Sequence, residues 1–243
     1  MGGDIEPDSM LPSEAALASE YGVSRTVVRE AMRLLAGRGL VVVRHGIPTR
    51  VAHRDDWNVL DRDVLRAHRW SPEIGALLTQ LIEARKRFEV PAAEMAATRA
   101  NAEQRAAIVR ASSQFDEGGP DDEGRLVASD VAFHRAILRA SGNRFFYHSA
   151  APLHEHMPMA MERIAIPDLE RARGWHHQIL EAILRRDGHQ AGEAMDKHLS
   201  DAETRIRRTV DAIQADPTRP PESTGEFAIP RWPLRGPVEA RRR

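Results

Sequence analysis

Residues 11–52 read LPSEAALASEYGVSRTVVREAMRLLAGRGLVVVRHGIPTRVA, and this stretch decides the fold of the N-terminal part. Ser13 and Ser24 are placed to cap two short helices. Gly22 makes the turn between them, and Gly39 ends the second helix. The runs LVVV and TRVA then predict two short strands joined by the turn RHGIP. This order is the layout of a winged helix-turn-helix, whose second helix lies in the major groove of DNA.

Positive charge falls on the same stretch. Between Ser24 and Arg50 there are six arginines and one acidic residue, Glu30, whereas the first 23 residues carry five acidic residues and no Lys or Arg. The positive field therefore lies on the predicted recognition helix and wing, as binding to DNA phosphates requires. The alternative, a solvated arginine face on an ordinary helix, does not account for the caps, the turn glycine and the wing together.

The composition of the whole chain excludes several classes of protein. The chain has 243 residues, of which 42% are hydrophobic, and its formal net charge is −1. With so small a net charge the chain as a whole is not a polyelectrolyte, so nucleic-acid binding has to come from a local basic surface. Because the chain has no cysteine, disulfides are excluded and a cytoplasmic setting is expected. No apolar run is long enough for a membrane-spanning helix, and MGGDIEPDSML is not a secretory signal.

The chain divides into four predicted parts and is expected to be mostly α-helical. Residues 1–52 form the winged helix-turn-helix, and residues 53–71 form a linker whose Trp and Leu side chains pack on its neighbours. Residues 72–214 carry long patterns with a period of 3.6 residues, broken at Pro91 among other places, which predicts a bundle of six or seven helices. Residues 215–243 are rich in Pro and Arg and are expected to be a disordered tail.

The motifs LPSE, GVSRTVVREAMRLL and HGIPT make the N-terminal part similar to the DNA-binding domain of the GntR superfamily of bacterial transcription regulators, FadR subfamily. Two departures from that pattern stand out. Ala15 occupies a position where the family places a phosphate-contacting Arg, and only MGGDIEPDSM precedes LPSE, so the family's first helix is expected to be missing. The resemblance implies DNA contacts by Ser24, Arg25, Thr26, Arg29, His45 and Gly46.

In the helical part, residues 129–137 read SDVAFHRAI and place Asp130 and His134 on one inward stripe of a helix. His176 and His198 each lie on the apolar stripe of their own helix. Such stripes converge inside a bundle, and one carboxylate with three imidazoles suits Zn²⁺, Ni²⁺ or Mn²⁺. The alternative is a set of core histidines that bond to backbone carbonyls. The other histidines follow no stripe and are expected at the surface or rim, namely His148, His154, His156, His177 and His189.

Residues 72–214 resemble the FCD ligand-binding domain, the helical effector module of the same subfamily. The matching pieces are LIEARKRFEVPAAEMAATRA, SDVAFHRAILRASGN and HHQILEAILRRDGHQAGEAMDKHL. The resemblance implies that Arg85 clamps a carboxylate effector; the alternative is an exposed helix Arg paired with Glu89. The linker run WNVLDRDVLRAHRWSP resembles sugar-acid-responsive members. The metal implied is zinc, with nickel or manganese as alternatives, and its ligands would be Asp130, His134, His176 and His198.

These features predict a ligand-responsive transcription regulator, expected to be a repressor. A homodimer would read a palindromic double-stranded operator, and a small carboxylate such as a sugar acid would control it. The main alternative is a metal-dependent, hydrolase-like enzyme with a DNA-binding appendage. The sequence disfavours an enzyme because no Glu, Asp or Lys stands at helical spacing from the ligands on the inward face as an evident general base. A structural helical oligomer would leave the arginine-lined helix and wing unexplained.

Overall fold

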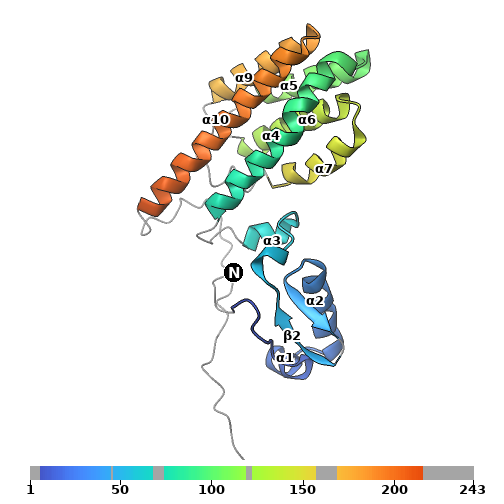
Figure 1. Ribbon diagram of the computed structural model, residues 1–243, viewed down its shortest axis with the longest axis vertical. Coiled ribbons are helices and arrows are strands. Elements are labelled where there is room, and N and C mark those ends of the chain that lie inside the picture. The colour runs from blue at the N-terminus through green and yellow to red at the C-terminus, as the bar shows by residue number, and fades with distance from the viewer. Residues whose placement is uncertain (1–5, 45, 68–73, 119–121, 157–168, 216–243) are drawn as a thin grey trace, which may run out of the picture.

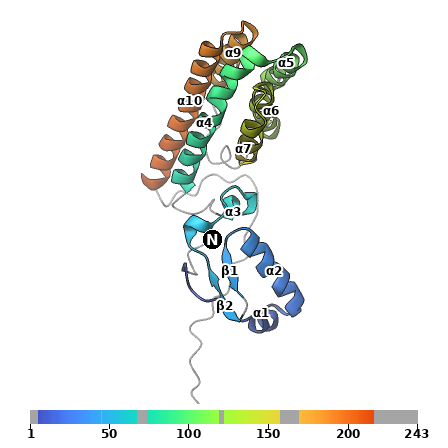
Figure 2. The same ribbon diagram turned by 45° about the vertical axis from the view of Figure 1, so that its right-hand side comes forward.

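The computed structural model describes residues 6–44, 46–67, 74–118, 122–156 and 169–215. These residues form an N-terminal unit of two helices with a β-hairpin, and a bundle of longer helices (Figures 1 and 2). The prediction of a mostly helical chain with a small winged unit is confirmed. None of the helices in the described ranges is both long and apolar enough to cross a membrane.

The N-terminal unit begins with α1 (Glu14–Tyr21) and α2 (Arg25–Gly37). The Ser13 hydroxyl accepts a hydrogen bond from the backbone N–H of the third residue after it at 3.2 Å, and Ser24 does the same at 3.3 Å. Gly22 lies between the helices with a φ of 64°, which is the left-handed conformation that glycine adopts without strain. The two helices pack through a small apolar cluster of Leu17, Ala18 and Val28, with Met32 beside it.

The hairpin consists of β1 (Val41–Arg44) and β2 (Ile47–Val51), which pair antiparallel with Val41 opposite Val51. Gly39 joins α2 to β1 with a φ of +73°, and a Cβ at this position would lie 2.0 Å from the backbone oxygen of Asp56. The residues before α1 run along the hairpin, where Met10 forms an isolated bridge with Arg50. The hairpin therefore gains a partner from the segment just before α1.

The predicted linker contains η1 (Arg54–Asp56) and α3 (Arg62–Ala67). Arg38, at the end of α2, donates to Asp61 at 3.2 Å and to Asp63 at 2.5 Å, which ties the linker to the N-terminal unit. Leu65 belongs to the main hydrophobic core of the bundle. The segment is thus a short structured connector that contacts both parts of the chain.

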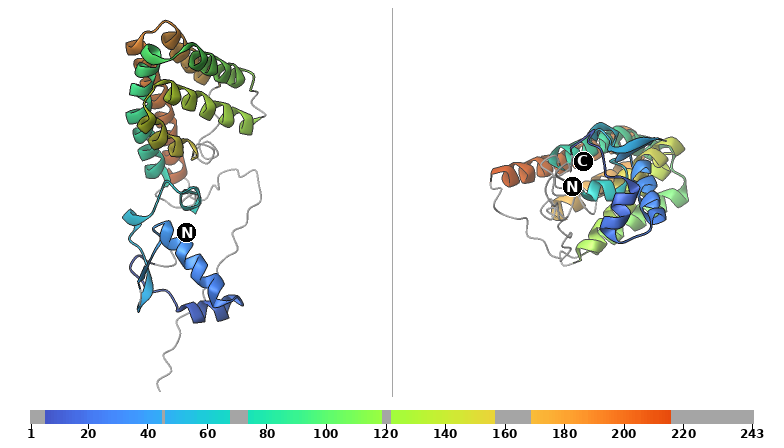
Figure 3. Two further views of the ribbon diagram at one scale, coloured as in Figure 1. Left: turned by 90° about the vertical axis from the view of Figure 1, so that its right-hand side faces the viewer. Right: turned by 90° about the horizontal axis from the view of Figure 1, so that it is seen from below.

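Within the described residues the bundle contains six helices: α4 (Ile74–Arg99), α5 (Ala102–Asp116), α6 (Glu123–Ala140), α7 (Arg144–His154), α9 (Leu169–Leu184) and α10 (Gly188–Ala215). Helices α4 and α10 lie side by side along the bundle, and α5 and α6 pack together across them (Figure 3). The fully buried side chains at the centre include Ile82, Phe133, Ile137, Ile179, Ile183, Met195 and Leu199.

The break predicted at Pro91 is wrong, because α4 continues through it to Arg99. A proline inside a helix costs about 3 kcal/mol, since it lacks an N–H and crowds the preceding turn. The following turns of α4 bury Ala92, Ala93 and Ala96 almost completely in the bundle core. Tertiary packing of this small-residue face therefore outweighs the local penalty. The predicted disordered tail, from residue 216 on, lies outside the described residues.

Candidate metal centre and nucleic-acid interface

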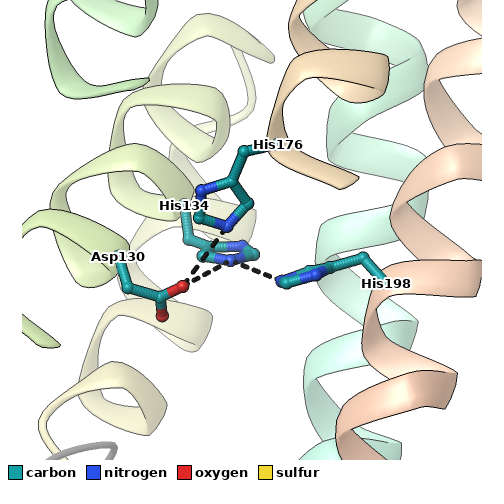
Figure 4. A group of neighbouring side chains, drawn as sticks. All are labelled: Asp130, His134, His176 and His198. Atoms are coloured by element: carbon teal, nitrogen blue, oxygen red, sulfur yellow. Dashed lines mark hydrogen bonds and ion pairs between the residues drawn. The ribbon is translucent and has the colours of Figure 1, made fainter. Parts of the chain in front are cut away.

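Four polar side chains meet at the centre of the bundle (Figure 4). Asp130 and His134 come from successive turns of α6, His176 comes from α9 and His198 from α10. All four are buried, and one ligand atom from each lies within 4.8 Å of all the others. The convergence that the apolar stripes of these three helices predicted is therefore present in the structure.

The interatomic distances show how the nitrogen and oxygen atoms face one another. His134 Nε2 lies 3.2 Å from His198 Nε2. The Asp130 carboxylate oxygen Oδ1 lies 3.3 Å from His176 Nε2 and 3.7 Å from His134 Nε2. Three imidazole Nε2 atoms and one carboxylate oxygen thus surround one point, which is the donor set that a divalent transition metal takes. Two facing imidazole nitrogens can share at most one hydrogen, so a cation satisfies this group better than hydrogen bonds do.

The electrostatics of Asp130, His134 and His198 suit metal binding. Burial raises the pKa of the Asp130 carboxyl, but His134, His176 and Arg85 outweigh that effect and hold the pKa below its ordinary value. Burial lowers the pKa of His134 and, together with the neighbouring histidines, lowers the pKa of His198 strongly. At neutral pH Asp130 is therefore ionised and these two imidazoles are neutral, which are the protonation states of metal ligands.

A second buried group adjoins the first, and sequence reasoning missed most of it. Glu89 on α4 is 1% exposed, and its oxygen Oε1 accepts from Arg85 Nε at 2.6 Å and lies 3.0 Å from His154 Nε2. The other oxygen, Oε2, lies 2.5 Å from His134 Nδ1. Arg85 is thus paired with Glu89, as one of the two alternatives proposed, but the pair is buried rather than exposed. The carboxylate connects α4, α6 and α7.

The prediction that His154 and His156 lie at the surface or rim is wrong. Both are buried, at 1% and 2% exposure, whereas His148, His177 and His189 are exposed. His154 is the last residue of α7 and follows Ala150, Ala151 and Leu153, which are also buried. That short apolar run was the available signal. It is a weak signal, because a stripe near the end of a helix covers too few turns to show a period.

The expected DNA-contacting residues lie on the first turns of α2 and on the hairpin. Ser24, Arg25, Thr26 and Arg29 are all exposed. Arg29 also donates to Glu14 of α1 at 3.1 Å, which holds the two helices together. Gly46 lies in the hairpin turn with a φ of 72°, and His45 lies outside the described residues. Figure 2 shows α2 and the hairpin side by side on the unit.

Several arginines of the predicted basic surface are paired with acidic side chains. Arg38 is occupied by the linker aspartates, and Arg50 pairs with Asp8. Arg33 donates to Glu30 one turn earlier on the same helix at 2.6 Å. Because Arg29 is also paired, with Glu14, only Arg25 on α2 and Arg44 on β1 have no acidic partner among the described residues.

Comparisons with known proteins agree with this architecture. The model of bacterial regulatory proteins of the gntR family matches residues 1–51, and the FCD domain model matches residues 80–201. Among solved structures, Lar, which controls expression of the Listeria monocytogenes agr system, has a TM-score of 0.59 at 16% identity and covers 85% of this chain and 90% of its own. A Streptococcus agalactiae GntR structure has a TM-score of 0.50 at 23% identity, with coverages of 83% and 91%. These two likenesses show the fold.

Sequence relatives extend over most of the chain. The HTH-type transcriptional regulator YieP of Escherichia coli is 31% identical over 195 residues, covering 79% of this chain and 84% of that protein. The galactonate operon transcriptional repressor of E. coli is 28% identical, with coverages of 79% and 85%. The repressor NanR of Salmonella newport is 29% identical, with coverages of 78% and 74%. These relatives are transcription regulators and not enzymes, so the metalloenzyme alternative is not supported. The chain belongs to the GntR family of bacterial transcription regulators and joins a winged helix-turn-helix to an FCD domain.

Proposed function

We propose that this regulator is a repressor whose hold on its operator is controlled by a small carboxylate bound at a metal site in the FCD domain. The observation that carries the proposal is the buried meeting of Asp130, His134, His176 and His198. Two relatives, NanR and the galactonate operon regulator, are named as repressors, which supports the sign of regulation. The galactonate regulator makes sugar acids the first class of effector to test.

The four residues are the proposed ligands, with zinc as the expected ion and nickel or manganese as alternatives. When bound, the ion supplies a Lewis-acidic position to which a carboxylate can attach. Charge also favours binding of the metal before binding of the carboxylate effector. When the imidazoles are neutral, the two negative charges of Asp130 and Glu89 and the positive charge of Arg85 leave the buried group with one net negative charge. A bound divalent cation reverses the sign of that net charge. An anion therefore enters a repulsive site without metal and an attractive site with it.

Arg85 is the proposed second contact for the effector carboxylate. Its guanidinium is buried and is held in one orientation by two hydrogen bonds to Glu89, at 2.6 and 3.3 Å. Its charge also acts on Asp130, whose pKa it lowers. A fixed, desolvated guanidinium next to the ligand set is the group best suited to orient a carboxylate.

For DNA, the proposed contacts are Ser24, Arg25, Thr26, Arg29, His45 and Gly46. A homodimer acting in the cytoplasm would place two copies of α2 one turn of DNA apart on a palindromic operator. The effector can shift this arrangement only if its affinity differs between the DNA-bound and released placements.

A thermal-shift screen of small carboxylates, with and without a chelator, tests the proposal. Galactonate and related sugar acids should raise the unfolding temperature of metal-loaded protein, and the shift should disappear when a chelator has removed the metal. The uncharged amide of each hit serves as a matched control and should give no shift. A carboxylate that stabilises the chelated protein equally would refute the metal anchor.

A further inference from the structure

Glu89 is a buried carboxylate that the four proposed ligands do not explain. Its side chain is 1% exposed and lies at the meeting of α4, α6 and α7. Burying a carboxylate is costly unless charged or hydrogen-bonding partners compensate for the lost water. Here Arg85 contacts both oxygens, and His134 and His154 contact one oxygen each. The carboxylate is thus ionised and held from three sides.

The two ring nitrogens of His134 face different groups. Nε2 lies among the proposed ligand atoms, 3.2 Å from His198 Nε2. Nδ1 points to the other side and lies 2.5 Å from Glu89 Oε2, within hydrogen-bonding distance. A proton on Nδ1 leaves the lone pair on Nε2, which is the tautomer that a metal requires from this side.

Glu89, His134 and His154 are also close enough to hold a second cation, so two interpretations compete. The position of Arg85 decides between them. Its guanidinium already donates to both oxygens of Glu89, so a divalent ion there would have to approach a buried positive charge and displace those bonds. Orientation of His134 requires no such displacement and uses the contacts as they stand.

We propose that Glu89 is a positioning residue for the metal centre, holding the His134 imidazole so that Nε2 faces the ion. Arg85 and His154 in turn hold the Glu89 carboxylate in place. This inference rests on the proposed metal site and adds a group outside the ligand set. Through His154, the same carboxylate ties the end of α7 to the orientation of a ligand on α6.

Cobalt titration of the full chain, after removal of metal with a chelator, tests this role. The visible absorption of bound Co²⁺ reports its coordination geometry, and competition with a chelator gives its affinity. Glu89→Gln keeps the size of the side chain and removes its charge. We expect it to bind one Co²⁺ per chain about 10- to 100-fold more weakly than the wild type, with an altered spectrum. Glu83→Gln is the matched control, because Glu83 is exposed on the same helix.

Several results would overturn the inference. One is an affinity and spectrum for Glu89→Gln equal to those of the wild type, while Asp130→Ala abolishes binding; the metal site would then stand without a role for Glu89. Another is a second Co²⁺ in the wild type that Glu89→Gln loses, which would make Glu89 a ligand. If the wild type binds no Co²⁺, the metal site and the inference fail together.

If Glu89→Gln does not fold, a second variant still tests the inference. Glu89→Gln leaves the charge of Arg85 buried without its partner, which is strongly destabilising in some proteins. The double variant Arg85→Met, Glu89→Gln removes both charges at similar volume and so avoids that cost. The same loss of affinity and the same spectral change are expected from it, and wild-type values in this folded variant would overturn the inference.

Discussion

Replacing His198 with leucine should destabilise the protein when metal is present but not when a chelator has removed the metal. His198 is buried on α10, and Nε2 faces His134 Nε2 at 3.2 Å. Leucine has a similar volume and cannot bind metal. With metal present, the wild type should therefore be more stable than His198→Leu. With a chelator, the variant should be at least as stable, because it no longer buries a polar ring whose partners are other imidazoles.

The size of the metal effect follows from binding to the folded state alone. Free metal at 100 to 1,000 times the dissociation constant adds about 2.7 to 4.1 kcal/mol to the free energy of unfolding. For a helical domain of this size, about 4 °C of unfolding temperature corresponds to each kcal/mol. Zinc should therefore raise the unfolding temperature of the wild type by roughly 10 to 16 °C and leave that of His198→Leu almost unchanged.

Differential scanning calorimetry with zinc and with a chelator measures both differences. Leu199→Ala is the matched control, since Leu199 is the next residue and is fully buried in the core. It should lose about 2 to 5 kcal/mol under both conditions, because its loss is a packing loss. If His198→Leu behaves like Leu199→Ala, with equal destabilisation with and without metal, His198 is a core residue and the reasoning fails.

Three further predictions concern the parts around the site. Gly39→Ala should destabilise the winged unit by more than about 1 to 2 kcal/mol, the cost of a left-handed residue, because its Cβ would also clash with the Asp56 backbone; faster amide hydrogen exchange in α2 would show it, and unchanged exchange would contradict it. Arg25→Ala should weaken operator binding by about 1 to 3 kcal/mol in fluorescence anisotropy, whereas Arg33→Ala, whose side chain already has an acidic partner, should have a smaller effect. Asn101→Ala removes the capping box of α5 and should cost about 1 kcal/mol in thermal unfolding, with the metal content unaltered.

Local signals in the sequence predicted the N-terminal unit well. Ser13 and Ser24 cap the helices as expected, and Gly22 adopts the left-handed turn, because caps and turns depend on neighbouring residues only. The meeting of Asp130 with His176 was also predictable, since each lies on the apolar stripe of a long helix and the stripes must face inward. These features need no knowledge of how the helices are ordered in space.

The parts that were not predicted depend on tertiary packing. A pair spaced like Arg85 and Glu89 occurs on exposed and buried faces alike. Both lie on the buried face of α4 with Leu78, Leu81 and Ala92, but a stripe on one helix does not show which side chains of other helices will compensate a buried carboxylate. Pro91 predicts a break because its local cost is visible in the sequence, whereas the compensating contacts with other helices are not. His154 gains its role only when α7 packs beside α4.

Elemental analysis of the purified chain tests the central claim most directly. We expect about one divalent transition-metal ion per chain in the wild type and almost none in the double variant His134→Ala, His176→Ala, with helical content measured by circular dichroism as the check on folding. A wild-type chain without metal, or a folded double variant with the same metal content as the wild type, would contradict the account.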